Sequence, residues 1–263
     1  MADWSLVAAR RDVERAPAER VFGLPHPALA GQVLSYTAHD FPAMERMSWR
    51  WAPLGAVTVV LDITAPTRWG MPASPVLGLR DRPAEVEQAG ASRGITIALS
   101  PAGAHALLGL PLREVANTAI GLVDLLGRDA ARLLERVAEA GGWPERFHVL
   151  DAFLAPRLRA GPALALPVRG AWQRLTESAG RLRISDLADE VGWTRQHLSA
   201  RFRAQIGLPP KSVARIVRLH HATTLLSHLP LAEVAHRCGY ADQAHLNRDF
   251  RALTGASPTE RHQ

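Results

Sequence analysis

A nine-residue segment occurs twice in this chain, 48 residues apart. Residues 202–210 read FRAQIGLPP and residues 250–258 read FRALTGASP, so Phe, Arg, Ala, Gly and Pro occupy the same positions in both copies. Each copy belongs to the second of two short helical patterns that are separated by a Gly-aromatic turn. The repeat predicts two similar helix-turn-helix units in tandem, and such units read double-stranded DNA.

The first unit covers about residues 184–206. Apolar residues at helical spacing form the buried stripe of its first helix, and they are Ile184, Leu187, Ala188 and Val191. We expect Ser185 to cap this helix and Thr194 to cap the second one, after a turn at Gly192-Trp193. The second helix carries its stripe at Leu198, Phe202 and Ile206.

The second unit covers about residues 231–254 and repeats this plan. Its apolar stripe and turn consist of Val234, Ala235, Cys238, Gly239-Tyr240, Leu246, Phe250 and Leu253. Ala188 and Ala235 fall at equivalent positions, where a small side chain allows the two helices of a unit to cross closely. Residues 212–228 read as one long helix between the units, a rigid spacer that would place them on successive major-groove faces, roughly 34 Å apart.

The second helix of each unit is expected to enter the major groove. In the first unit its outward residues are Thr194, Arg195, Gln196, Ser199, Ala200 and Arg203. In the second unit they are Asp242, Gln243, Ala244, His245, Asn247 and Arg248. Arginine suits guanine, and glutamine or asparagine suits adenine, so these residues are the predicted DNA contacts. The alternative is that they form ordinary solvated helix faces.

The motifs of this segment follow a known order. They are Ile184-x-x-Leu187-Ala188, Gly192, Leu198-x-x-x-Phe202, Gly207, Pro210, Arg218-Leu219, Ala222, Leu225-Leu226, Val234-Ala235, Gly239-Tyr240-Ala241-Asp242-Gln243, His245-Leu246, Phe250 and Gly255-x-x-Pro258. In these features residues 168–261 resemble the AraC/XylS family of bacterial transcription regulators. The resemblance implies a helix-turn-helix DNA-binding domain, contact with RNA polymerase near a promoter, and activation of transcription.

The charge of the chain is unevenly divided. Residues 1–167 hold 17 arginines and 17 acidic residues, whereas residues 168–263 hold 14 basic and 8 acidic residues. The whole net charge of +6 therefore lies in the part that carries the repeat, as expected of a segment that faces phosphates.

Other features bound the class of protein. The sequence contains no run of about 18 apolar residues, so no membrane span is expected. Residues 1–4 lack the pattern of a signal peptide. The single cysteine, Cys238, lies on an apolar stripe, which favours a buried core residue over a redox sensor. Together these features favour a cytoplasmic protein.

The N-terminal half shows strands followed by helices. Residues 54–64 read as a buried strand because they are rich in β-branched residues, and residues 76–79 and 95–99 are further strand candidates. The helical patterns cover residues 104–108, 115–126, 129–140 and 145–158, and residues 161–167 read as a linker. Residues 100–111 and 122–127 resemble the N-terminal part of a subgroup of AraC-type regulators, which implies a sensing or dimerising role.

Aromatic side chains beside a few polar groups are typical of small-molecule sites. By this criterion the candidate effector-binding residues are Glu45, Arg46, Trp49, Trp51, Arg68 and Trp69. The alternative is that the tryptophans belong to the core and the charged residues to the surface.

The sequence lacks the motifs of metal and nucleotide sites. One cysteine excludes a four-cysteine zinc site, and His26, His39 and His105 lack the spacing of metal ligands. A glycine-rich nucleotide motif is missing as well. We therefore expect no catalytic residues, no metal and no cofactor.

The sequence thus predicts a DNA-binding transcription regulator in two domains. Residues 1–162 form an α+β sensing or dimerisation domain, and residues 163–263 form an all-α DNA-binding domain with two helix-turn-helix units joined by a long helix. The expected partners are double-stranded promoter DNA, RNA polymerase, a small-molecule effector and a second copy of the chain. An effector-responsive activator is favoured. The alternatives are a ligand-independent DNA-binding dimer and an enzyme with an appended DNA-binding module.

Overall fold

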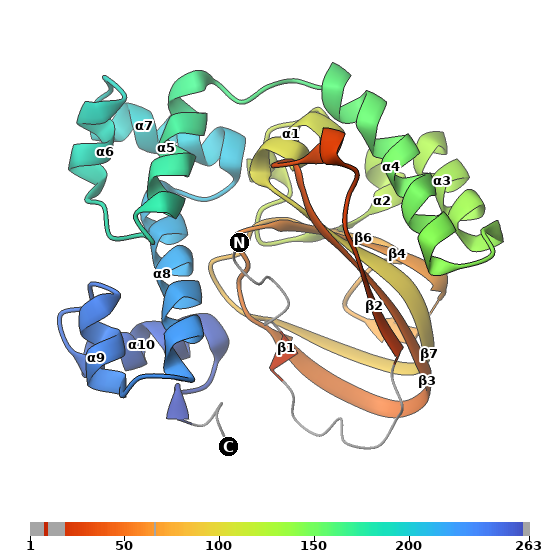
Figure 1. The fold of residues 1–263 in the computed structure, drawn as a ribbon, viewed down its shortest axis with the longest axis horizontal. Helices are drawn as coiled ribbons and strands as arrows, with labels where there is room; N and C mark the ends of the chain where they lie inside the picture. The colour runs from red at the N-terminus through yellow and green to blue at the C-terminus, as the bar shows by residue number, and fades with distance from the viewer. Residues whose placement is uncertain (1–7, 10–18, 66, 260–263) are drawn as a thin grey trace.

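The computed structural model describes residues 8–9, 19–65 and 67–259 (Figure 1). Residues 1–4, where the sequence lacks a signal pattern, and residues 260–261, at the end of the family resemblance, lie outside this part of the chain. An antiparallel sheet with flanking helices is followed by an all-helical C-terminal part. The predicted fold class, α+β and then all-α, is therefore confirmed.

The strands of the described residues form one antiparallel sheet. They are β1 (Ala8–Ala9), β2 (Glu19–Gly23), β3 (Val33–Trp51), β4 (Val57–Thr64), β5 (Thr67–Trp69), β6 (Pro75–Leu77), β7 (Ala84–Leu99) and β8 (Ala119–Gly121). Their order is β1-β3-β7-β4-β6-β8, with β2 paired to β3 and β5 paired to β7. The long strands β3 and β7 therefore form the frame to which the short strands attach.

Local sequence explains the shape of this sheet. The first five residues of β4, starting at Val57, are all buried, and most of them are β-branched residues that suit a pleated core strand. β3 is irregular, because its register against β7 shifts between Phe41 and Met44 and again before Met47. Such irregularities bend a strand, and the sheet is visibly curved in Figure 1.

The helices of the N-terminal half lie along one side of the sheet (Figure 1). They are η1 (Pro27–Leu29), α1 (Pro101–Leu108), η2 (Leu112–Glu114), α2 (Leu122–Leu126), α3 (Arg128–Glu139) and α4 (Trp143–Ala160). α4 is fixed to the sheet through Asp151, which accepts hydrogen bonds from Tyr36 Oη at 2.9 Å and from His26 N at 3.0 Å. Burial raises the pKa of Tyr36, so its hydroxyl remains a donor.

The C-terminal helices form a block beside the sheet domain, coloured green to blue in Figure 1. They are α5 (Leu166–Glu177), α6 (Ile184–Glu190), α7 (Arg195–Ile206), α8 (Pro210–Leu226), α9 (Leu231–Arg237) and α10 (Gln243–Thr254). Residues 161–165 connect α4 to this block, and the domain boundary that we predict at residue 162 falls in this connection. In the described part of the chain, no helix is both long enough and apolar enough to cross a membrane.

Two apolar cores stabilise the molecule. The larger core runs from the sheet, at Leu61 and Ile97, through α4 and into the first helix-turn-helix unit, where it includes Leu198 and Phe202. The smaller core consists of Ala222, Val234, Ala235, Cys238, Tyr240 and Leu246. The first unit therefore shares one core with the sheet domain, whereas most of the second unit has a core of its own. Cys238 is buried, as predicted.

Two predictions about local structure are wrong. Residues 115–126 do not form one helix, because β8 occupies Ala119–Gly121 and only Leu122–Leu126 are helical. β8 pairs with β6, and this long-range pairing outweighs the helical spacing of the apolar residues. Ser185 does not cap α6, which starts one residue earlier at Ile184. Its hydroxyl instead donates to Asp186 at 2.9 Å.

Candidate nucleic-acid interface

The turns of the two helix-turn-helix units share one backbone hydrogen bond. Trp193 N donates to Ala188 O at 2.9 Å in the first unit, and Tyr240 N donates to Ala235 O at 2.9 Å in the second. The two alanines are 1% and 2% exposed, so each lies where two helices meet. Their predicted role as small residues at a helix crossing is confirmed.

Side-chain caps start both second helices. Thr194 Oγ1 accepts from His197 N at 3.2 Å at the start of α7, which confirms the predicted cap. Asp242 Oδ1 accepts from His245 N at 2.6 Å at the start of α10. The two caps are 48 residues apart, whereas Ala188 and Ala235 are 47 apart, so the second turn is one residue longer.

Contacts with the spacer helix α8 orient α10. Arg215 of α8 donates to Asp249 of α10 at 2.8 and 3.1 Å. The guanidinium of Arg218 lies over the ring of Tyr240, 5.4 Å from its centroid. These contacts hold the second unit against the spacer.

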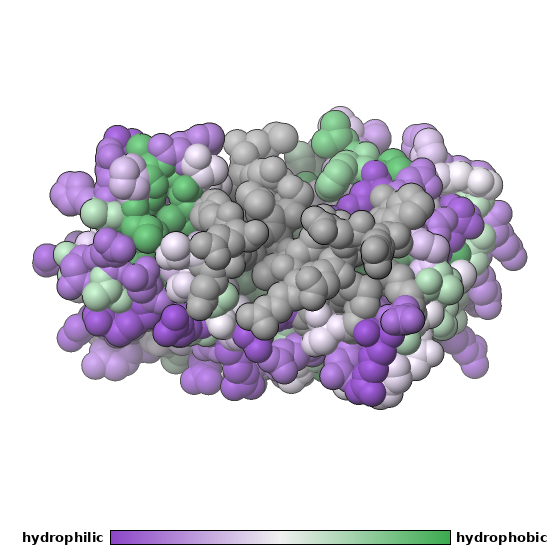
Figure 2. Space-filling model, turned by 90° about the horizontal axis from the view of Figure 1, so that it is seen from below, coloured by the Kyte–Doolittle hydropathy of each residue, from purple (hydrophilic) through white to green (hydrophobic). Residues whose placement is uncertain are grey.

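The predicted DNA contacts lie mostly on exposed faces of α7 and α10. The exposed residues are Thr194, Arg195, Gln196, Ala200, Arg203, Asp242, Gln243, Ala244 and Arg248, and the half-buried residues are Ser199, His245 and Asn247. The exposed side chains are open to solvent, although Arg203 also lines a groove between the end of α7 and the sheet domain. Figure 2 shows the molecule from below, where the C-terminal block, on the left, is largely hydrophilic apart from one apolar area.

Arg251 is a further candidate DNA contact that is not among the twelve outward residues predicted from the sequence. Arg251 is the repeat equivalent of Arg203, and both side chains are exposed on the last turns of their helices. The alignment of the two repeat copies is the feature of the sequence that could have identified Arg251. Arg251 therefore joins the candidate contacts, at a position suited to a phosphate because the C-terminal end of such a helix leaves the groove.

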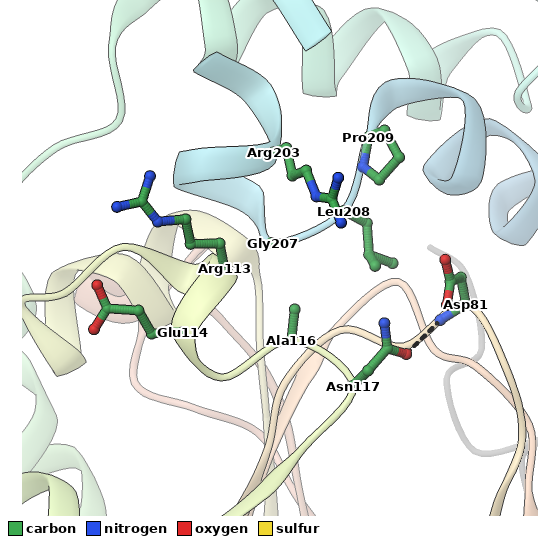
Figure 3. Close-up of a pocket in the computed structure, with 9 residues that line it drawn as sticks. All are labelled: Asp81, Arg113, Glu114, Ala116, Asn117, Arg203, Gly207, Leu208 and Pro209. Carbon is green, nitrogen blue, oxygen red and sulfur yellow. Dashed lines mark hydrogen bonds between the residues drawn. The ribbon is translucent and has the colours of Figure 1, made fainter. Parts of the chain in front are cut away.

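A groove lies between the sheet domain and the first unit (Figure 3). Its lining comes from both parts of the chain and consists of Asp81, Arg113, Glu114, Ala116, Asn117, Arg203, Gly207, Leu208 and Pro209. Asp81 N donates to Asn117 Oδ1 at 3.2 Å on its floor. The end of α7 thus faces the η2 loop of the sheet domain directly.

Among the candidate effector residues whose side chains the structure describes, Arg46 and Trp69 are brought into contact. Arg46 lies over the ring of Trp69, 4.7 Å from its centroid, and pairs with Glu87. Glu45 is exposed, and Trp51 is half-buried at the C-terminal end of β3, opposite Ala84. The backbone of Trp49 lies on β3 opposite Val86, but its side chain is outside the described part of the structure.

Arg68 belongs to a buried polar cluster that sequence reasoning missed. It donates to both carboxylate oxygens of Asp62, at 2.8 and 2.7 Å, and to Gln88 Oε1 at 3.2 Å. Gln88 Nε2 is buried without a hydrogen-bond partner among the described residues. His39 lies nearby and its Nε2 is 3.2 Å from Ser92 Oγ. The signal available in the sequence was Asp62, a charged residue inside the apolar strand β4.

Burial changes the protonation of His39. Desolvation, reinforced by the positive charge of Arg68, lowers the pKa of His39 to about 4. The imidazole is therefore neutral at physiological pH. Among the described residues, no group of three or more His, Cys, Asp or Glu side chains is arranged to hold a metal ion.

Comparisons with known proteins match the C-terminal part. Residues 187–262 match a family model described as a helix-turn-helix domain. The arabinose operon regulatory protein of Salmonella typhimurium is 33% identical over 103 residues, which cover 38% of this chain and 37% of that protein. The transcriptional activator RhaR of Salmonella arizonae is 38% identical over 65 residues, or 24% of this chain and 23% of that protein. The matches thus span well under half the length of these relatives.

A solved structure matches over more of the chain. ToxT of Vibrio cholerae has 11% sequence identity and a TM-score of 0.46, with 87% of this chain and 97% of that chain covered.

Proposed function

We propose that this chain is a sequence-specific, double-stranded-DNA-binding regulator of transcription of the AraC/XylS family. The helix-turn-helix match over residues 187–262 and the similarity to the arabinose operon regulatory protein support this proposal. The observation that carries the proposal is the pair of equivalent reading helices, α7 and α10, on one rigid spacer with their outward faces exposed. The twelve outward residues predicted from the sequence, with Arg251, are the proposed DNA contacts.

We further propose that the chain activates transcription in the cytoplasm in response to an effector. Support comes from relatives named as an operon regulatory protein and as a transcriptional activator. RNA polymerase is then the partner that the family resemblance implies. The sheet domain, whose charge is balanced, is proposed to bind a small molecule or a second copy of the chain. Ligand-dependent stabilisation of the chain would distinguish an effector from dimerisation alone.

The full chain should select a defined site from a pool of random duplexes. Its affinity for that site should fall steeply with salt, because each neutralised phosphate adds about −0.9 to the slope of log K against log salt. Failure to enrich any sequence, or an affinity independent of salt, would contradict the proposal.

Replacing Gln196 or Arg248 by alanine should relax base preference locally. Each side chain is exposed on the outward face of its helix, and a good base contact discriminates by about 1–3 kcal/mol. Repeating the site selection with each variant should show two separate patches of lost preference, about one helical turn apart. Gln173→Ala and Arg201→Ala are matched controls, since these exposed residues lie off the reading faces. Uniform weakening on all sequences would identify phosphate contacts instead.

A further inference from the structure

The repeat places a glycine at the end of each reading helix. Gly207 ends α7 and Gly255 ends α10, with φ angles of 102° and 79°. Both lie in the left-handed region, where a residue with a side chain is strained. These two glycines occupy the same position in the nine-residue repeat.

The sheet domain contacts the first of these glycines through its η2 loop. A Cβ atom added at Gly207 would lie 3.0 Å from Leu112 O and 3.3 Å from the side chain of Ala116. Gly207 and the following Leu208 are buried, and Figure 3 shows Gly207 beside the loop that carries Ala116. The end of α7 is thus packed against the sheet domain.

The sheet domain contacts the second glycine through Arg50. The side chain of Arg50 leaves β3, pairs with Glu85 of β7, and donates from Nη1 to Gly255 O at 3.3 Å. A Cβ atom added at Gly255 would collide with this guanidinium. The carbonyl groups at a helix C-terminus carry partial negative charge, which favours a cation there.

The spacer between the two glycines is held as well. His220 Nε2 lies 2.9 Å from Pro53 O, in the loop between β3 and β4, and Ser212 Oγ donates to Asp81 at 3.4 Å. The sheet domain therefore contacts the end of the first reading helix, the spacer, and the end of the second reading helix.

We propose that the sheet domain fixes the separation of the two reading helices, and that Arg50 is a residue that determines which spacing of DNA sites the chain accepts. This inference rests on the proposed function. The first unit is fixed because it shares the core of the sheet domain. Phe250 and Leu253 of α10 belong to the larger core, whereas the rest of the second unit has a separate core. The hydrogen bond from Arg50 adds a polar contact that joins the end of α10 to the sheet domain.

The spacing of base pairs makes the proposal testable. One inserted base pair moves a half-site by about 3.4 Å and about a tenth of a helical turn. Units that can shift relative to each other tolerate this change, whereas units fixed at both ends do not. Without the charge-assisted hydrogen bond from Arg50, the affinity lost on changing the spacing by one base pair should be about five- to tenfold smaller.

The experiment uses the full chain and a duplex that it has selected from random DNA. One base pair is inserted or deleted between the two contacted patches, and affinities are measured for the unchanged chain, Arg50→Gln and Arg93→Gln. Arg93 is the matched control because its side chain is 42% exposed, against 43% for Arg50, and it pairs with Asp40 within the sheet domain.

The unchanged chain and Arg93→Gln should lose about 5- to 150-fold in affinity on the altered duplexes, the usual range of a coupling between sites. For Arg50→Gln, the loss of affinity on the altered duplexes should be about five- to tenfold smaller. This variant should bind the selected duplex nearly as well as the unchanged chain does. Identical spacing profiles for all three proteins would overturn the inference. If the unchanged chain selects no duplex at all, the proposed function fails, which is a distinct result.

Discussion

The Asp62→Ala variant should be destabilised by about 3–5 kcal/mol, the usual effect of removing one partner of a buried ion pair. The side chains of Asp62 and Arg68 are only 4% and 9% exposed. Without the carboxylate, the guanidinium of Arg68 remains buried and uncompensated, and Ser74 N loses an acceptor at 2.7 Å. Denaturant unfolding of the full chain measures this change.

Two further variants make the result specific. Asp40→Ala removes the partner of Arg93 in a pair that is 36% and 42% exposed, and it should cost no more than about 1 kcal/mol. The double variant Asp62→Leu/Arg68→Met replaces the buried pair by apolar groups and should recover much of the lost stability. Equal stability of Asp62→Ala and Asp40→Ala would show that the buried pair is solvated in solution.

Lowering the pH from 7 to 4 should cost the fold about 3 kcal/mol through His39 alone, since each pKa unit corresponds to about 1.4 kcal/mol. Its pKa is about 4 in the folded chain against an ordinary value of 6.5. The unfolded chain therefore takes up a proton as the pH falls through 6.5, while the folded chain does so only near pH 4. This contribution to stability is complete above pH 6.5 and is lost progressively down to pH 4.

Other groups titrate in the same pH range, so the contribution of His39 is obtained by comparing the unchanged chain with a variant that lacks this imidazole. The free energy of unfolding is followed against pH for the unchanged chain and for His39→Gln, which retains a polar group near Ser92. The variant should show a shallower loss between pH 6.5 and 4. Parallel curves would mean that His39 is protonated in the folded chain at the same pH as in the unfolded one.

The repeat made the C-terminal part predictable. Its helices, turns and outward residues follow from short-range patterns, since every contact within a unit joins residues close in sequence. Ala188 and Ala235 could be placed at helix crossings from their equivalent positions alone. The prediction that Ser185 caps α6 is wrong because the helix already starts at Ile184. The spacing of apolar residues does not fix a helix boundary to within one residue.

The N-terminal part was harder to predict because its contacts join distant residues. β3 contains Pro42 and many polar residues, so its sequence does not read as a 19-residue strand, and only pairing with β7 makes it one. The buried cluster assembles His39, Asp62 and Gln88 from three different strands. Arg50 and Gly255 are 205 residues apart, and no local pattern signals their contact.

The apolar core that the first helix-turn-helix unit shares with the sheet domain limits how this chain can be recombined. A chimaera cut at residues 161–165 would separate Leu198 and Phe202 from partners across the connection and would leave the η2 loop facing a foreign surface. The second unit depends less on the sheet domain, because its core is mostly its own and only Phe250 and Leu253 belong to the larger core. Substitutions intended to change the DNA sequence that this chain prefers are therefore better made first in α10 than in α7.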